Sequence, residues 1–483
     1  MNIALNRRRF LKQTAAGVSL LPLSIQASSP AQNPELTKKP SFLFLLADDY
    51  RFDCIHALGC DEIQTPHLDR LIGAGTSFTN CYNQGGWQGA ICVASRTMLL
   101  TGCFLWKAQN RVLSMNETDA AGLLWPQQLQ HAGYHTYLSG KWHVECKPGA
   151  IFQTVRNVRP GMPPDVPAQY ERPKVGKDDP YNASDPSPGG YFSGGQHWSE
   201  TVAEDGISFI REAAQHDEPF FMYLSFNAPH DPRQSPEAYL RLYDPENLSL
   251  PENFLPEYPD NQAIGCGPDL RDERLAPFPR TPQAIRAHRR EYYALITHLD
   301  AQIGRILDAL HRSGRGDSTY VIFTADNGLA LGSHGLMGKQ NMYEHSMKVP
   351  FVLSGPGILA GHRLNALIYM QDIAPTLLEL AGISPSEPMD YQSLVPLLSG
   401  TRRSGYNAIY GAYLDLQRMI RIGGHKLIYY PALERFLLFD LEKDPHEIHD
   451  CIDVRQEAAT ISELKDNLRS LQLQLGDRLD IPV

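Results

Sequence analysis

Beyond its first residues, the sequence has no long hydrophobic run and no cluster of basic side chains. A membrane-spanning helix needs about 20 consecutive apolar residues, so we expect no stable insertion into a membrane. The net charge is −10 and the isoelectric point is about 5.9. The sequence also has no basic arm and no basic repeat. These features exclude a nucleic-acid-binding function. No internal repeat is visible.

The cysteines include no Cys-x-x-Cys pair, which argues against a zinc ribbon and against a thioredoxin-like site. There are eight, scattered along the chain, so each could be a small buried hydrophobic residue or half of a disulfide. In an oxidising compartment some of them can pair, but the sequence does not determine which. They are Cys54, Cys60, Cys81, Cys92, Cys103, Cys146, Cys266 and Cys451.

The N-terminus reads "NRRRFLKQTAAGVSLLPLSIQASSP", in which three arginines precede a short apolar run and a small-residue cleavage site. This order is typical of a twin-arginine export signal, which we place at residues 1–27. A basic tail lying on a membrane surface is the alternative, but it explains neither the apolar run nor the cleavage site. The sequence therefore predicts a bacterial protein handled by the twin-arginine export machinery and located in the periplasm or secreted.

Short hydrophobic runs alternate with helix-like segments along most of the chain. The runs have the length and composition of strands buried on both faces of a sheet, and they cover 41–47, 134–138, 219–226, 319–325 and 349–353. The helix-like segments cover 66–75, 93–101, 123–132, 199–215, 286–312 and 371–381. This alternation predicts an α/β fold with a large domain, in which helices sandwich a central, mostly parallel mixed sheet.

The last hundred residues have a different pattern. After a Pro- and Ser-rich junction near 383–405, "RMIRIGGHKLIYYP" and "ERFLLFDLEKDPHE" read as antiparallel strands, followed by a helix over 455–477. We therefore predict a large domain at 28–385 and a small C-terminal α+β domain with an antiparallel sheet at 386–483. Two long loops, 147–196 and 231–285, follow predicted strands, and we expect them to line a binding site.

Acidic side chains follow two of the predicted strands. Asp48 and Asp49 come directly after "SFLFLLA", and Asp326 and Asn327 come directly after "TYVIFTA". Ligands of open α/β sheets bind beyond the carboxyl ends of the strands, so these oxygens are expected to converge. An all-oxygen set suits a hard cation such as Ca²⁺ or Mg²⁺. Capping of a turn or a helix by each pair is the alternative.

Basic side chains follow other predicted strands. Lys141 and His143 lie in "TYLSGKWH", His230 ends "FFMYLSFNAPH", and Lys339 comes shortly after the second acidic pair. Taken singly, each could be a surface lysine or a structural histidine. Together beside a cation they suit an oxyanion substrate, because lysine and histidine donate hydrogen bonds to such oxygens and histidine also moves protons.

Cys92 starts the segment "CVASRTMLLTG", which we expect to open a helix whose N-terminus favours an anion. Arg96 follows one turn later. Ser95 is a possible ordinary nucleophile in the same segment, but the sequence places no base near it.

Taken together, these motifs resemble those of the formylglycine-dependent sulfatases of the alkaline-phosphatase superfamily. The matching stretches, in order, are "LLADDYRFD", "CVASRTMLLTG", "GKWH", "APHDP", "TADNG" and "HGLMGKQNMYEHSMKVPFV". The C-terminal "GGHKLIYY" and "LFDLEKDPHE" are also similar to the small domain of that family. One departure is Ala94, which stands where the family's Cys-x-Pro-Ser-Arg motif has proline.

The resemblance implies a sulfuric ester hydrolase whose 28–385 domain is catalytic. It implies that a maturation enzyme oxidises Cys92 to formylglycine, which hydrates to a gem-diol nucleophile. It also implies one Ca²⁺ per chain, held by Asp48, Asp49, Asp326 and Asn327 together with residue 92.

The resemblance assigns the remaining roles as well. Lys141 and Lys339 would bind sulfate oxygens, and His230 would bind substrate and assist the leaving oxygen. His143 would take the proton whose loss expels sulfate, and Arg96 would fix the formylglycine. The expected substrate is a sulfated oligosaccharide, with carrageenan first and ulvan or glycosaminoglycan fragments as alternatives. A phosphonate monoester or phosphodiester hydrolase on the same fold is the rival, and an anion-binding protein with an unmodified Cys92 is a second.

Overall fold

The computed structural model describes residues 38–115 and 121–482, and within them nine strands form one large sheet. The strand order is β10-β2-β9-β7-β1-β6-β4-β5, with β8 paired to β2. The strands are β1 Ser41–Ala47, β2 Thr76–Tyr82, β4 His135–Lys141, β5 Thr154–Arg159, β6 Phe220–Ser225, β7 Thr319–Ala325, β8 Lys348–Val349, β9 Phe351–Ser354 and β10 His362–Tyr369. The predicted export signal at 1–27 lies outside the described residues.

The sheet is mixed but mostly parallel, as predicted. Strands β7, β1, β6, β4 and β5 run parallel to one another, whereas β9 is antiparallel to both β7 and β2. Every residue of β1, β6 and β7 is buried, which explains their near-continuous apolar sequences. Because the four central parallel strands end at one edge, the residues that follow them are brought together there.

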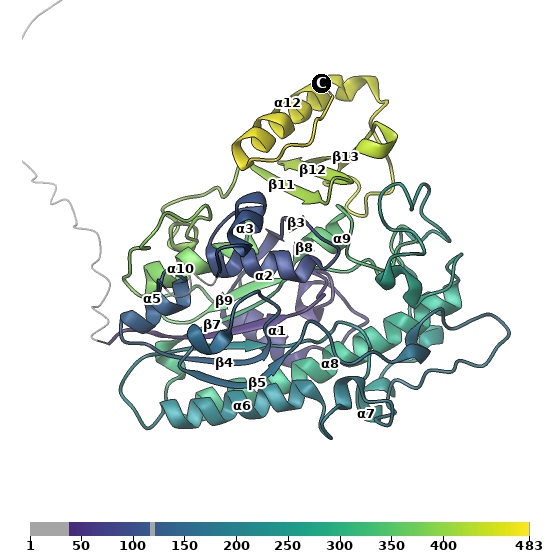
Figure 1. The fold of residues 1–483 in the computed structure, drawn as a ribbon. Coiled ribbons are helices and arrows are strands. Elements are labelled where there is room, and N and C mark those ends of the chain that lie inside the picture. Colours follow the sequence, from purple (N-terminus) through teal and green to yellow (C-terminus); the bar gives the residue numbers. More distant parts are fainter. Residues whose placement is uncertain (1–37, 116–120, 483) are drawn as a thin grey trace, which may run out of the picture. The chain divides into compact units, whose positions relative to one another are not determined.

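Helices cover both faces of this sheet (Figure 1). On one side α6 packs on β4 and β6, and α8 packs against both α1 and α6. On the other side α2, α5 and α10 pack together. Their bounds are α1 Pro66–Ala74, α2 Ile91–Thr101, α5 Trp125–His131, α6 Trp198–Ala213, α8 Pro282–Arg312 and α10 Ile373–Leu380. Helix α8 begins with a Thr281 cap that accepts a hydrogen bond from the Ala284 N–H.

A second, smaller sheet carries the C-terminal part of the chain. Its order is β14-β13-β12-β11-β3, and α12 packs on β12 and β13 (Figure 1). The elements are β3 Gly85–Gly86, β11 Ala408–Tyr413, β12 Gln417–Ile422, β13 His425–Tyr430, β14 Arg435–Asp440 and α12 Ala458–Leu475. The pairs among β11 to β14 are antiparallel, so the predicted fold class is confirmed. The division at 385/386 stays a prediction, since β3 joins this sheet from much earlier in the chain.

Several elements differ from the sequence-based prediction. Strands β2, β5 and β10 were not predicted, because β2 and β10 mix polar with apolar residues and β5 lies inside the 147–196 loop. The predicted strand at 349–353 is two short strands, interrupted at Pro350. Further helices are α3 Leu105–Val112, α7 Glu237–Leu240, α9 Glu344–Met347 and α11 Val395–Leu398. No helix among the described residues is both long and apolar enough to span a membrane.

Candidate active site

The acidic pairs after β1 and β7 meet at the carboxyl edge of the sheet, and all four residues are buried. The Asn327 side-chain N–H donates to Asp49 Oδ1 at 2.6 Å, and the Asp49 backbone N–H donates to Asp326 Oδ1 at 3.4 Å. Potential ligand atoms of Asp48, Cys92 and Asp326 all lie within 4.8 Å of one another. The structure therefore brings the predicted metal ligands and the predicted nucleophile position into one cluster.

The chemistry of this cluster fits a hard cation. Asp48 Oδ1 and Asn327 Oδ1 are buried oxygens with no hydrogen-bond partner among the described residues, a costly state unless something else binds them. Burial and the Asp326 carboxylate raise the pKa of Asp48 well above its usual value, although Lys141 opposes them. Burial would also raise the pKa of Asp326, but the charges of Arg96, Lys141 and Lys339 lower this pKa to about 2.

Two lysines neutralise the acidic cluster. Lys141, the last residue of β4, places Nζ 2.5 Å from Asp48 Oδ2. Lys339 places Nζ 2.6 Å from Asp49 Oδ1. Both side chains are buried, and the pKa of Lys339 lies well above its usual value because Asp49 and other acidic neighbours outweigh the effect of burial. Each lysine is therefore a charged donor fixed within the cluster.

Cys92 is the second residue of α2, which begins two residues before the predicted start at 93, and its Sγ lies 3.3 Å from His143 Nδ1. Burial raises the pKa of the Cys92 thiol even though both lysines lower it. Burial, followed by the charges of Lys141 and Arg96, lowers the pKa of His143 to about 3. The encoded thiol is thus not an activated thiolate, since reactive cysteines have a lowered pKa.

His143 is held in an unusual position. Its backbone φ is +54°, in the left-handed region, and its ring lies against Gly161. A Cβ atom built on Gly161 would lie 2.3 Å from His143 Cε1. Glycine at this point of the 147–196 loop is what lets the ring face position 92.

Arg96 connects α2 to three strand ends. Its Nε donates to Asp326 Oδ2 at 2.8 Å, and its Nη1 donates to Ser225 Oγ at 2.6 Å and to the Lys141 carbonyl at 3.1 Å. Its Nη2 is buried without a hydrogen-bond partner in the described part of the chain. Ser95 Oγ donates to the Asp326 carbonyl at 2.8 Å. Ser95 is therefore committed to the structure of the site and is no alternative nucleophile.

His230 follows β6 and is buried beside the acidic cluster, with Nε2 3.7 Å from Asp49 Oδ2. Its Nδ1 faces Asp231, at 2.8 Å from the carbonyl and 3.2 Å from Oδ1. Two Arg271 nitrogens donate to the Asp231 carboxylate at 2.5 and 3.1 Å. Asp231 was not predicted to be a site residue, although its position directly after His230 in "APHDP" could have indicated that it contacts this histidine.

A pocket of about 380 Å³ opens onto this site. Cys92, His143, His230 and Lys339 are among the residues that line it. Both long loops contribute to its wall, the first through Pro160, Gly161 and Met162 and the second through Leu270, Arg271 and Asp272. The loops thus line the cavity as expected. Most of their other basic and aromatic side chains lie elsewhere, and Arg172 and Tyr181, for example, are buried within the protein.

Comparison with known proteins identifies the family of the chain. Residues 40–383 match the family model described as Sulfatase, and residues 332–474 match the model described as N-sulphoglucosamine sulphohydrolase, C-terminal. The N-acetylglucosamine-6-O-sulfatase of Bacteroides thetaiotaomicron is 25% identical over 530 residues, covering 95% of this chain and 91% of that protein.

Two solved structures share the fold. One is a protein in complex with its substrate D-glucosamine-2-N,6-O-disulfate, with a TM-score of 0.71 and 23% identity, covering 91% of this chain and 99% of the other. The second is the phosphonate monoester hydrolase of Agrobacterium radiobacter, with a TM-score of 0.68 and 22% identity, covering 90% and 96% of the two chains.

Proposed function

The chain belongs to the sulfatase family, and we propose that it hydrolyses an ester sulfate of a sulfated carbohydrate, using Ca²⁺ and a formylglycine made from Cys92. Its activity class, sulfuric ester hydrolase, follows from the family. The observation that carries the proposal is the buried cluster in which Asp48, Cys92 and Asp326 offer ligand atoms within 4.8 Å of one another.

Asp48, Asp49, Asp326 and Asn327, with residue 92, would hold the calcium ion. The two buried oxygens without partners, on Asp48 and Asn327, support this assignment. When bound, a divalent cation would supply Lewis-acid chemistry, lowering the pKa of a hydroxyl at position 92 and polarising a sulfate oxygen.

Formylglycine at position 92 would supply a hydrated aldehyde, with one hydroxyl to attack sulfur and a second whose deprotonation releases sulfate. His143 would take that second proton, because its Nδ1 already faces the position 92 side chain. The pKa of His143 is lowered to about 3, so its ring is neutral and carries one unprotonated nitrogen that can accept a hydrogen bond from this hydroxyl. Arg96 would hold the hydrated group through Nη2, which is buried and has no hydrogen-bond partner among the described residues.

The lysines and His230 act on the substrate. Lys141 and Lys339 would donate to sulfate oxygens and offset the charge that develops in the transition state. His230 would bind the substrate and protonate the leaving alcohol oxygen. Its imidazole lines the pocket together with Cys92 and Lys339, so one ester can reach all three.

We propose an algal galactan fragment such as carrageenan as the substrate, with ulvan and glycosaminoglycan fragments as the next candidates. The lining of the pocket supports an anionic sugar, since it includes the partly exposed Arg271 guanidinium. We further propose export through the twin-arginine machinery to the periplasm or medium, and conversion of Cys92 by a formylglycine-generating enzyme.

The test is sulfate release from defined sulfated oligosaccharides by protein carrying the aldehyde, checked by hydrazide labelling of position 92. We expect kcat/KM on at least one sulfated sugar to exceed that on phosphonate monoesters and phosphodiesters by about 100-fold or more. Faster turnover of the phosphorus esters would instead establish the rival hydrolase activity. Binding of sulfated sugars by a chain that is never converted and never turns them over would establish an anion-binding protein.

We expect Asp231→Asn to lower kcat/KM roughly tenfold and to move the alkaline limb of the pH profile to lower pH. Burial and the Lys339 charge lower the pKa of His230, whereas Asp49 and Asp231 raise it. Loss of the Asp231 charge lowers that pKa further, so the general acid loses its proton at lower pH. The measurement is kcat/KM against pH on a sulfate ester.

Asp272→Asn is the matched control for this variant. Asp272 also pairs with Arg271, but the carboxylate that His230 Nδ1 faces is that of Asp231. The control should therefore leave the alkaline midpoint in place. An unchanged midpoint in Asp231→Asn would contradict the positioning of His230 by Asp231.

A further inference from the structure

Two of the eight cysteines lie across a tight turn directly after the first acidic pair. Cys54 begins the turn, a short 3-10 helix spans His56–Leu58, and the Cys60 N–H donates to the Ile55 carbonyl at 3.3 Å. Gly59, with φ +111°, reverses the chain just before Cys60. The backbone therefore folds residue 60 back beside residue 54.

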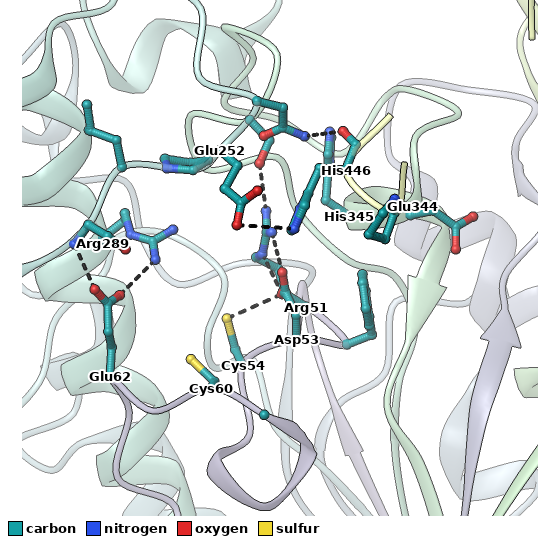
Figure 2. Close-up of a pocket in the computed structure, with 18 of the residues that line it drawn as sticks. Arg51, Asp53, Cys54, Cys60, Glu62, Glu252, Arg289, Glu344, His345 and His446 are labelled. Atoms are coloured by element: carbon teal, nitrogen blue, oxygen red, sulfur yellow. Dashed lines mark hydrogen bonds and ion pairs between the residues drawn. The ribbon is translucent and has the colours of Figure 1, made fainter. Parts of the chain in front are cut away.

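The two thiols line the same pocket. Cys54 Sγ donates a hydrogen bond to Asp53 Oδ1 at 3.7 Å, Cys60 Sγ donates to the Tyr293 hydroxyl at 4.0 Å, and both side chains are free cysteines. Figure 2 shows them together in the wall of a pocket of about 370 Å³, which is separate in its lining from the pocket at Cys92. Cys54 is buried, while Cys60 is partly exposed to this pocket.

We propose that Cys54 and Cys60 are a modification site that closes to an intramolecular disulfide when the folded chain meets a small-molecule or protein disulfide oxidant. The pocket gives the oxidant a path to Cys60, and the turn supplies the second thiol at once. The pair is independent of Cys92, so its oxidation consumes no residue of the proposed active site.

The order of steps follows from the two environments. The neighbouring Cys54 thiol is the largest cause of a lowered pKa at Cys60, whereas burial raises the pKa of Cys54 well above its usual value. Cys60 therefore loses its proton and attacks the oxidant. The oxidant's S–S bond breaks, one half leaves as a thiol, and Cys60 holds the other half as a mixed disulfide.

Cys54 completes the exchange. Its thiol loses a proton, attacks the Cys60 sulfur and expels the second half of the oxidant as a thiol. The two protein thiols thereby lose two hydrogens, and the oxidant's disulfide gains them.

The bond would fasten a segment that supports the active site. In that segment the Arg51 N–H donates to the Tyr292 hydroxyl, which donates to the Asp49 carbonyl. Arg51 Nη1 also donates to the carbonyls of Leu329 and Ala330, just beyond the second acidic pair. Because a short loop is closed, we expect the melting temperature to rise by only about 2–5 °C on oxidation.

The test is peptide mapping of the full chain after exposure to glutathione disulfide under native conditions. Trypsin releases residues 52–70 as one peptide that contains both cysteines. We expect this peptide to be two hydrogens lighter than its reduced form and to resist alkylation until it is reduced. Cys81, which is fully buried, serves as an internal control that stays a thiol.

Two variants identify the attacking thiol. Cys54→Ser should trap glutathione on Cys60, whereas Cys60→Ser should leave Cys54 without an adduct. An oxidant-treated wild-type peptide that still takes two alkyl groups overturns the proposal, as does pairing of either cysteine with a third one. These outcomes need no sulfatase activity and are therefore distinct from failure of the proposed function.

Discussion

Replacement of Cys92 by alanine is expected to lower sulfate release by at least about four orders of magnitude. The side chain at position 92 lies 3.3 Å from His143 Nδ1 and lines the pocket. Ser95 cannot replace it, because its hydroxyl is buried and bound to the Asp326 carbonyl. The measurement is sulfate release at saturating substrate, with hydrazide labelling to show that the wild type carries the aldehyde and the variant does not.

Cys103→Ala is the matched control, because Cys103 is also a buried thiol but lies just beyond the far end of α2. It should keep both the aldehyde signal and the activity. If Cys92→Ala retained more than a few per cent of the wild-type rate, residue 92 would not be the nucleophile. Conversion of Cys92 to formylglycine would then have no role in the reaction.

Most of the residues of the site could be predicted from the sequence, because they directly follow the ends of strands that the sequence reveals. Buried parallel strands have near-continuous apolar sequences, so 41–47 and 319–325 could be recognised as β1 and β7 with their true bounds. The polar residues just beyond them then had to meet at one edge. Edge strands offered no such signal, since β10 exposes much of its first half.

The missing parts of the site come from loop geometry. Nothing in the sequence of the 147–196 loop shows that Gly161 lies under the His143 ring. Likewise, the contact of Arg271 with Asp231 joins residues 40 positions apart through a long loop whose path the sequence does not show. The proposed pairing of Cys54 with Cys60 could not be predicted from the sequence, because any of the eight cysteines could have been a partner. The structure of the turn was needed to identify the pair.

Replacement of Asp48 by asparagine is expected to lower sulfate release by about 10²–10³-fold and to remove most of the stabilisation by calcium. Asp48 supplies a buried oxygen without a hydrogen-bond partner and lies within 4.8 Å of ligand atoms on Cys92 and Asp326. A ligand that binds only the folded chain stabilises it by RT ln(1 + [L]/Kd), so the melting temperature of the wild type should rise with added calcium and that of the variant should barely move.

Asp317→Asn, which alters an exposed carboxylate, is the control and should follow the wild type in both measurements. If added calcium raised the melting temperature of Asp48→Asn as much as that of the wild type, the calcium ion would not be bound by Asp48.

The same contacts predict what a chelator does. In the structure Lys141 pairs with Asp48, Lys339 with Asp49 and Arg96 with Asp326, so three buried acidic side chains face three buried basic ones. Because this arrangement is balanced in charge, the chain should stay folded when calcium is removed, although sulfate release stops. Readdition of calcium should then restore the rate. Unfolding on chelation would mean that the lysines do not neutralise the carboxylates as strongly as their short contacts indicate, and that calcium is needed for the fold itself.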